Sequence, residues 1–175
     1  IGARWDVDVP DEYEPRFNVA PRDQLAVIPN DEPDALDLQH WGLLPGWVDD
    51  PNDWNYPINA RCETVHEKPS FRDAYAKRPC LVLSDGFYEW AGDRGSKQPY
   101  RICREDGEPF AFAGIWEQWS ENGRSRESVC IITCDANDVV SDIHDRMPVI
   151  LEERDESTWL TGEPKVRREL LTPYA

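Results

Sequence analysis

The sequence lacks any long hydrophobic run. No apolar stretch approaches the ~20 residues that a membrane-spanning helix needs. Residues 1–10 also lack the basic segment followed by an apolar one that marks a secretory signal. We therefore expect a soluble, cytoplasmic protein with no membrane partner.

The sequence also lacks a cysteine pattern for zinc or for paired disulfides. Its 5 cysteines are an odd number and contain no C-x-x-C pair. Four of them sit among apolar residues, which favours reduced, buried thiols in a cytoplasm. We expect no metal and no cofactor. The cysteines are Cys62, Cys80, Cys103, Cys130 and Cys134.

Basic residues are few, with 19 Lys and Arg against 35 Asp and Glu, and the net charge is −16. Such a balance ordinarily argues against a nucleic-acid partner, because phosphate binding depends on Lys and Arg. The sign of the net charge alone does not exclude one. Acidic residues scattered along the whole chain suit solubility at very high salt, so we expect a halophilic source, with an ordinary acidic cytosolic protein as the alternative.

Aromatic and aliphatic residues are plentiful enough for one well-buried core, and we expect a single domain over residues 1–175. The patterns predict an exposed lead-in at 1–15 and a loop with aromatic side chains at 47–57. They indicate an α+β fold with a mostly antiparallel sheet, or a partly open β-barrel, and short flanking helices. The predicted strands are 25–28, 36–44, 81–90, 99–104, 108–119, 128–134 and 149–151, with turns at 92–95, 106–107 and 122–123, and the helices are 70–77, 135–143, 152–160 and 165–171.

Three polar side chains stand in positions that suit chemistry. Glu89 lies among aromatic residues, where a desolvated carboxyl suits a general acid or base, although a Glu on the wet face of an edge strand fits equally well. His144 precedes an Asp-Arg pair that could orient its ring, although a lone His is more often structural. Asn59 could orient a carbonyl or an imine, or simply cap a turn.

Taken together in order, five motifs resemble the SOS-response-associated peptidase (SRAP) family over nearly the whole chain. Single residues among them are weak signals, whereas the ordered set is specific. The motifs are Arg16–Pro21 (RFNVAP), Trp41–Trp47 (WGLLPGW), Ile58–Thr64 (INARCET), Asp85–Trp90 (DGFYEW) with Lys97–Tyr100 (KQPY), and Ile143–Pro148 (IHDRMP).

The resemblance implies capture of abasic sites in single-stranded DNA. Proteins of the family begin Met-Cys-Gly-Arg, and the exposed amino-terminal Cys forms a thiazolidine with the sugar aldehyde after autoproteolytic removal of what precedes it. We therefore expect the nucleophilic Cys to lie upstream of Ile1, and a final strand to follow Ala175. The chain as written would display the cleft without cross-linking.

The resemblance also implies roles for individual residues. Glu89 would act as acid or base at the terminal amine, His144 would move a proton at the sugar hydroxyl, and Asn59 would hold the Cys and the adduct. Family positions that contact DNA match Arg61, Arg146, Trp47, Pro45, Gly46, Pro21 and Asn18.

Two other functions remain open at the level of sequence. One is a non-catalytic module that binds single-stranded DNA through the same cleft, and the other is a Cys-His hydrolase with His144 as its base. We expect a monomer, and the sequence identifies no protein partner.

Overall fold

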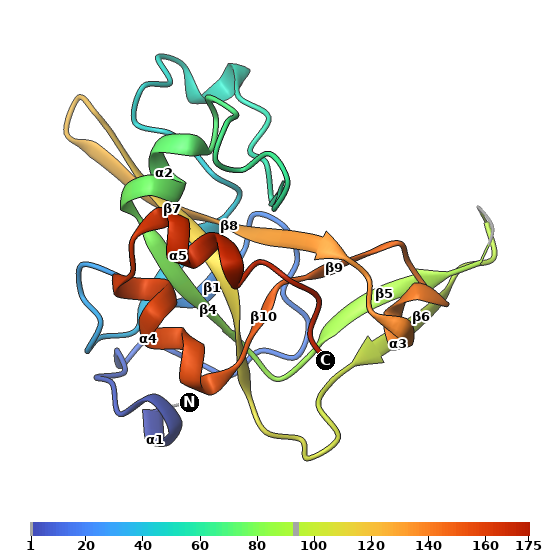
Figure 1. The fold of residues 1–175 in the computed structure, drawn as a ribbon. Coiled ribbons are helices and arrows are strands. Elements are labelled where there is room, and N and C mark those ends of the chain that lie inside the picture. The colour runs from blue at the N-terminus through green and yellow to red at the C-terminus, as the bar shows by residue number, and fades with distance from the viewer. Residues whose placement is uncertain (1, 93–94) are drawn as a thin grey trace.

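Five strands close into a β-barrel at the centre of the molecule. The computed structural model describes residues 2–92 and 95–175, so the turn expected at 92–95 lies partly outside them. The strands follow one another around the barrel in the order β7, β4, β1, β2 and β8, and β8 pairs back with β7 (Figure 1). They are β1 (Gln24–Pro29), β2 (Asp37–Trp41), β4 (Pro79–Ser84), β7 (Phe110–Glu121) and β8 (Arg124–Asp135).

The closed barrel confirms the α+β class but not the partly open form. All neighbouring barrel strands are antiparallel except β2 and β8, which are parallel and share two residue pairs, His40 with Ser128 and Trp41 with Val129. This parallel pairing joins segments almost ninety residues apart. A local strand pattern carries no signal for it.

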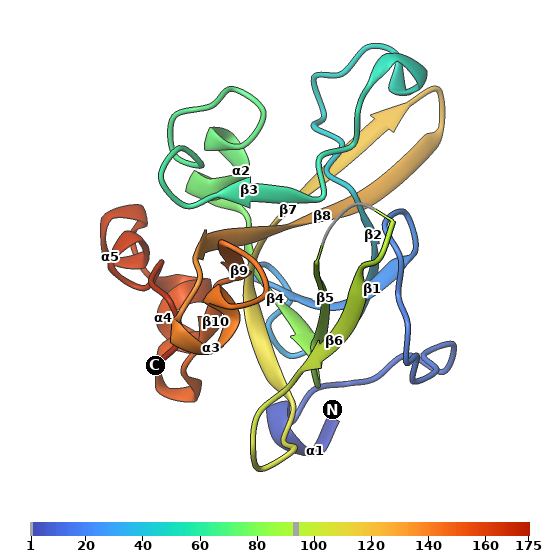
Figure 2. The ribbon, with the colours of Figure 1, turned by 90° about the vertical axis from the view of Figure 1, so that its right-hand side faces the viewer.

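Five shorter strands extend the barrel. β3 (Asn59–Arg61) pairs in parallel with β8, β9 (Arg146–Pro148) pairs antiparallel with β8, and β10 (Ile150–Leu151) pairs with β7. β5 (Phe87–Ala91) and β6 (Gln98–Ile102) form a separate hairpin in front of the barrel (Figure 2).

The strand expected at 81–90 is two strands, because the chain bends between β4 and β5. The Ser84 hydroxyl donates to the carbonyl of Gly86 at 2.6 Å and closes the bend. A Cβ at Gly86 would lie only 2.8 Å from the carbonyl oxygen of Ile102. Glycine is therefore needed where the bend approaches β6.

Short helices cover one side of the barrel, as expected. α2 matches the prediction at 70–77, and α4 and α5 match those at 152–160 and 165–171. No helix among the described residues is long and apolar enough to cross a membrane. The helices are α1 (Gly2–Trp5), α2 (Arg72–Lys77), α3 (Asp138–Ser141), α4 (Glu153–Thr161), α5 (Pro164–Glu169) and the 3-10 turn η1 (Pro51–Asp53).

The core has two layers because side chains alternate along each barrel strand. One cluster fills the barrel interior and includes Val82, Phe112 and Val129. The other lies between the outer surface of the barrel and the helices. There Trp159 of α4 is completely buried, and its indole Nε1 donates to the Cys80 carbonyl at 2.9 Å.

The opening segment is not the exposed lead-in that the sequence suggested. The indole of Trp5 and the guanidinium of Arg4 both donate to the buried carboxylate of Glu156 on α4, at 2.9 and 2.8 Å. Trp5, Val7 and Tyr13 also pack against the outer core. The acidic character of the segment concealed these anchors.

Replacing Trp159 tests the outer core layer. Trp159→Ala should lower the free energy of unfolding by about 3–5 kcal/mol, because it leaves a large cavity. Trp159→Phe retains most of the packing and loses the bond to Cys80, so it should cost about 1–2 kcal/mol. Urea unfolding followed by circular dichroism measures both. An equal loss for the two variants would contradict this account of the core.

Candidate functional site

Strand β8 brings two of the conserved-looking motif segments to the same place. Its residue Thr133 pairs with Arg61 of β3 on one edge and with Pro148 of β9 on the other. Asn59 begins β3, and His144 lies just before β9. Asn59 and His144, more than eighty residues apart in the chain, thus flank the last third of one strand.

The guanidinium of Arg146 holds this arrangement together. Its Nη1 donates to Glu63 at 2.6 Å and to Asp135 at 2.7 Å. Its Nη2 donates to Glu63 at 3.0 Å and to the Thr133 carbonyl at 2.8 Å. The Arg146 side chain is only 15% exposed. A DNA phosphate would therefore have to displace a carboxylate to reach it.

His144 lies at the surface with its ring orientation set by the backbone. The Arg146 N–H donates to Nδ1 at 3.0 Å. A neutral ring that accepts at Nδ1 carries its proton on Nε2. The second nitrogen can then donate to a ligand, while Asp145, with Oδ1 3.2 Å from Nδ1, stabilises the ring when it is charged.

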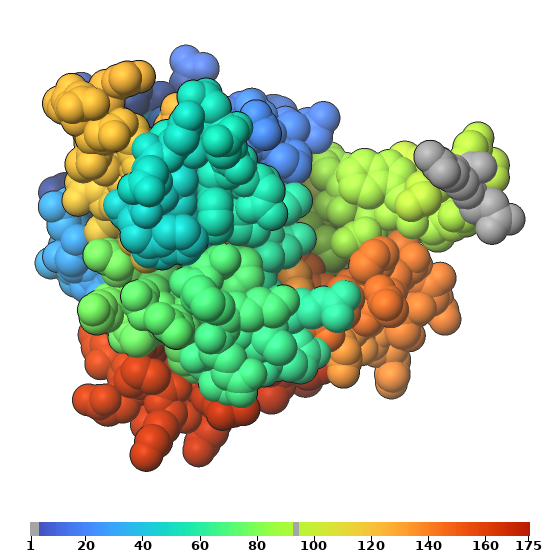
Figure 3. Space-filling view, turned by 90° about the horizontal axis from the view of Figure 1, so that it is seen from above, coloured from blue at the N-terminus to red at the C-terminus, as the bar shows by residue number. Residues whose placement is uncertain are grey.

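Glu89 comes from a different element, the β5–β6 hairpin. It is half-buried, whereas the neighbouring rings of Tyr88 and Trp90 are exposed. The hairpin lies beside the segment of α3 and β9 that contains His144 (Figure 3). Among the described residues, no hydrogen bond or ion pair joins Glu89 to Asn59 or His144. Sequence and structure thus place Glu89 next to this segment without a direct link.

Asn18 and Pro21 lie on an exposed loop that borders the same hairpin. The Tyr88 hydroxyl donates to the Phe17 carbonyl at 3.2 Å, which ties the loop to β5. Asp23 accepts from the Ala20 N–H at 3.0 Å and so fixes the turn around Pro21. Both predicted DNA-contact residues are therefore accessible.

The loop after β2 presents an exposed tryptophan on a rigid mount. The Trp47 ring is 53% exposed and meets the Trp54 ring edge-on, with centroids 5.2 Å apart. The indole of Trp54 donates to the Leu43 carbonyl at 2.7 Å, and that of Trp119 donates to the Val48 carbonyl at 2.8 Å. Two bonds thus hold the backbone on either side of Trp47.

The rest of this loop divides between core and surface. Pro45 is buried and Gly46 is exposed, with its backbone so close to β7 that a Cβ would lie 3.0 Å from the Gln118 carbonyl. Trp41 is half-buried and donates to the Ile58 carbonyl at 3.0 Å, so it closes the core. Trp54 supplies a second ring beside Trp47, which sequence reasoning did not assign. The tryptophan content of loop 47–57 was its only signal.

Arg61 is the cation most available to a ligand. It is exposed on β3, and among the residues that the structure describes it forms no ion pair. Nor do three or more His, Cys, Asp or Glu side chains in the described ranges form a group that could hold a metal ion. The five cysteines are free thiols, and Cys80, Cys130 and Cys134 are buried.

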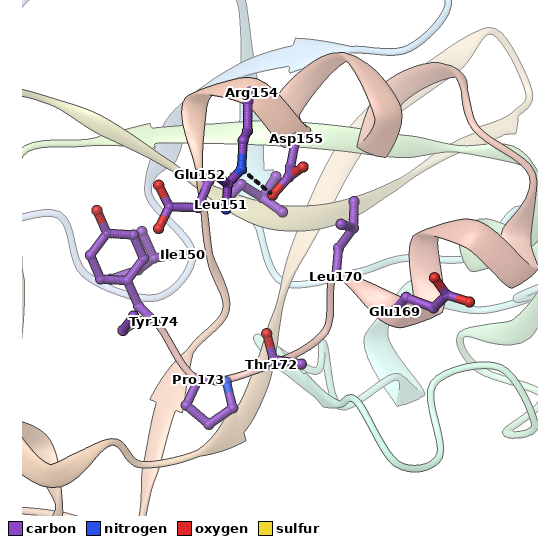
Figure 4. Close-up of a pocket in the computed structure, with 11 residues that line it drawn as sticks. Ile150, Leu151, Glu152, Arg154, Asp155, Glu169, Leu170, Thr172, Pro173 and Tyr174 are labelled. Carbon is purple, nitrogen blue, oxygen red and sulfur yellow. Dashed lines mark ion pairs between the residues drawn. The ribbon is translucent and has the colours of Figure 1, made fainter.

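A shallow cavity of about 220 Å³ lies away from all these residues. It is formed by α4, α5 and the last residues of the chain (Figure 4). Its lining contains no predicted site residue, and Arg154 and Asp155 pair across its rim. The candidate site is therefore the open surface between β3, β9, the hairpin and the Trp47 loop.

Changing Glu63 tests the Arg146 ion pair. The hydrogen bond from Arg146 lowers the pKa of Glu63 to about 2, against the usual 4.5. A lowered pKa contributes stability above pH ~4.5, and this contribution disappears as the pH falls through ~2. Glu63→Gln should cost about 1 kcal/mol or less at pH 7, because 49% of the side chain is exposed. The difference from the unmodified protein should vanish by pH 2. Glu67→Gln, an exposed neighbour, is the control, and a pH-independent loss in Glu63→Gln would contradict the prediction.

Comparison with known proteins places this surface in context. A family model described as SOS response associated peptidase (SRAP) matches residues 2–175. The abasic site processing protein YoqW of Bacillus subtilis is 41% identical over 169 residues, covering 93% of this chain and 75% of the relative. The abasic site processing protein YedK of Escherichia coli is 35% identical over 161 residues, covering 89% and 70%. These relatives give no support to the expected halophilic source.

Solved structures agree with the fold. A crystal structure of a Bordetella bronchiseptica protein superimposes with a TM-score of 0.86 at 28% identity, covering 99% of this chain and 89% of that one. The sequence match extends over nearly the whole chain, as the five motifs did. The chain therefore belongs to the SOS response associated peptidase (SRAP) family.

Proposed function

We propose that this protein recognises abasic sites in single-stranded DNA and captures them covalently. The observation that carries the proposal is the convergence of Asn59, Arg61 and His144 on the last third of β8, beside a hairpin that carries Glu89. The names of the relatives YoqW and YedK, abasic site processing proteins, support the same substrate.

The proposed chemistry joins the sugar aldehyde to an amino-terminal cysteine that the family start would supply. The α-amine adds to the aldehyde and loses water to give an imine, and the thiol then adds to the imine carbon to close a thiazolidine. An α-amine with a pKa of ~7.7–8.0 is only about a tenth to a sixth neutral at pH 7, so a base helps. Autoproteolytic removal of a preceding residue would expose that amine.

The described residues divide the proposed work between them. Glu89, half-buried between two exposed rings, accepts the proton from the amine. His144 donates through Nε2 to the sugar hydroxyl, since its Nδ1 accepts from the backbone. Asn59 holds the adduct from the adjacent strand, with an amide that donates and accepts.

DNA binding rests on stacking and on a few cations. Trp47 offers an exposed face to a base, supported edge-on by Trp54. Arg61 meets a phosphate, and Arg146 contributes to DNA binding by exchanging a carboxylate partner. Asn18, Pro21, Pro45 and Gly46 shape the walls. All these residues come from one chain, so we propose a cytoplasmic monomer that associates with the nucleoid when it binds DNA.

Cross-linking tests the proposed function. Full-length protein with an exposed amino-terminal Cys is incubated with single-stranded DNA that contains one abasic site. A denaturant-resistant adduct is expected, and replacing that Cys by Ala should abolish it. A chain that starts at Ile1 is the matched control, because none of its cysteines has a free α-amine. Reversible binding without an adduct would support a binding module, and turnover of a peptide or ester would support a hydrolase.

Glu89→Gln should slow cross-linking about tenfold at pH 7, because only the neutral fraction of the amine then reacts. The rate should recover by pH ~9, where the amine is neutral without help. The rate of adduct formation between pH 6 and ~9 measures both effects. Glu108→Gln removes an exposed carboxylate at the end of the same segment and should not change the profile. A deficit that persists at high pH would exclude the base role.

Trp47→Ala should weaken binding to undamaged single-stranded DNA about 5- to 100-fold. Stacking of a base on an aromatic ring is worth ~1–3 kcal/mol. Fluorescence anisotropy with a labelled oligonucleotide measures the affinity. Val166→Ala, which also shortens an exposed apolar side chain, should bind like the unmodified protein. Unchanged affinity in Trp47→Ala would show that this ring does not contact DNA.

A further inference from the structure

An acidic pocket lies beside the junction of β2 and β8. It has a volume of about 170 Å³, and four carboxylates and no basic residue contribute to its lining. The carboxylates come from the loop after β1, from β2 and from β8. The lining residues are Pro29, Asp31, Glu32, Leu36, Asp37, Gln39, Trp116 and Glu127.

Two of these carboxyl groups are in direct contact. Glu127 of β8 and Asp37 of β2 share a hydrogen bond, which requires that a proton lie between them. Burial, and then the neighbouring Asp37, raise the pKa of Glu127 to about 7. The Gln118 amide approaches Glu127 only to 3.5 Å. Negative charge is thus concentrated here without a cationic partner in the lining.

A buried amide points to a missing ligand at the same place. Gln39 is 1% exposed, and its Nε2 donates to the Asp37 carboxylate at 2.9 Å. This bond fixes the amide orientation, because the reverse orientation would bring two oxygens together. The other amide atom, Oε1, is buried and has no hydrogen-bond partner among the described residues. A buried acceptor without a donor or cation is unfavourable.

We propose that this pocket binds one hard divalent cation, Ca²⁺ or Mg²⁺, through the carboxylates of Asp37 and Glu127 and the amide oxygen of Gln39. All three donors are oxygen atoms, the type that these cations prefer. The cation takes the place of the shared proton and provides a partner for Gln39. Water and the rim carboxylates Asp31 and Glu32 complete the coordination.

The position gives the cation a structural effect. Asp37 lies on β2 and Glu127 on β8, and these strands share only two residue pairs, the fewest of any neighbouring strands in the barrel. A cation that binds both strands would strengthen the junction that closes the barrel. The inference does not depend on the proposed DNA chemistry, because the cation residues are distinct from the proposed DNA residues.

Calorimetry without DNA tests the site. Protein freed of metal with a chelator is titrated with CaCl₂ or MgCl₂ at pH 8 and a constant ionic strength of about 0.15 M. Saturable binding of one ion, with a rise in melting temperature beyond that in KCl, is expected. The two salts distinguish the ions. Absence of saturable binding up to about 10 mM of both salts, above the ~10⁻³ M of weak calcium sites, would overturn the proposal.

Matched variants separate a site from general attraction to an acidic protein. Glu127→Gln and Gln39→Met should each weaken binding by about 10- to 100-fold. Glu121→Gln removes the same charge from the tip of the same β7–β8 hairpin and should bind normally. Melting without cation shows that each variant folds. Equal affinity in Glu127→Gln, or an equal loss in Glu121→Gln, would also overturn the proposal.

Discussion

The geometry of the site depends on the contact between Arg146 and its three oxygen partners. Glu63 follows β3, while Asp135 and Thr133 lie at the end of β8. The strength of such an ion pair in a half-wet setting is small, but its geometry is specific because the guanidinium donates in a fixed plane. The same residue directs its backbone N–H at His144. One side chain therefore sets the relative position of two separate motifs.

Local patterns predicted most of the regular structure. The hairpin of β1 and β2 and the helices α4 and α5 follow alternation, turn residues and 3.6-residue spacing. The strands β3 and β9 were missed because each has three residues and exists only through pairing with β8. The parallel closure of the barrel and the docking of α1 on Glu156 are likewise long-range contacts that no local pattern encodes.

The candidate site was predictable in its members and not in its connections. The order of the motifs indicated Asn59, Glu89 and His144, but Glu63 was read only as part of a motif. Arg146 was expected to be free for phosphate, whereas it is occupied by carboxylates. Charge compensation of this kind depends on side chains that meet in space. In a chain of net charge −16, many arginines are engaged by neighbours, so the free cations are a more informative guide than the total.

The mounting of the Trp47 loop has a consequence for how its sequence can change. The indoles of Trp54 and Trp119 both donate to main-chain carbonyls, at Leu43 and Val48. Neither bond involves the side chain of the residue that accepts it. The path of the loop is therefore independent of the side chain that it displays, and a different ring or a polar group placed at position 47 would be presented in the same direction. The loop is a preorganised holder whose contents can be exchanged.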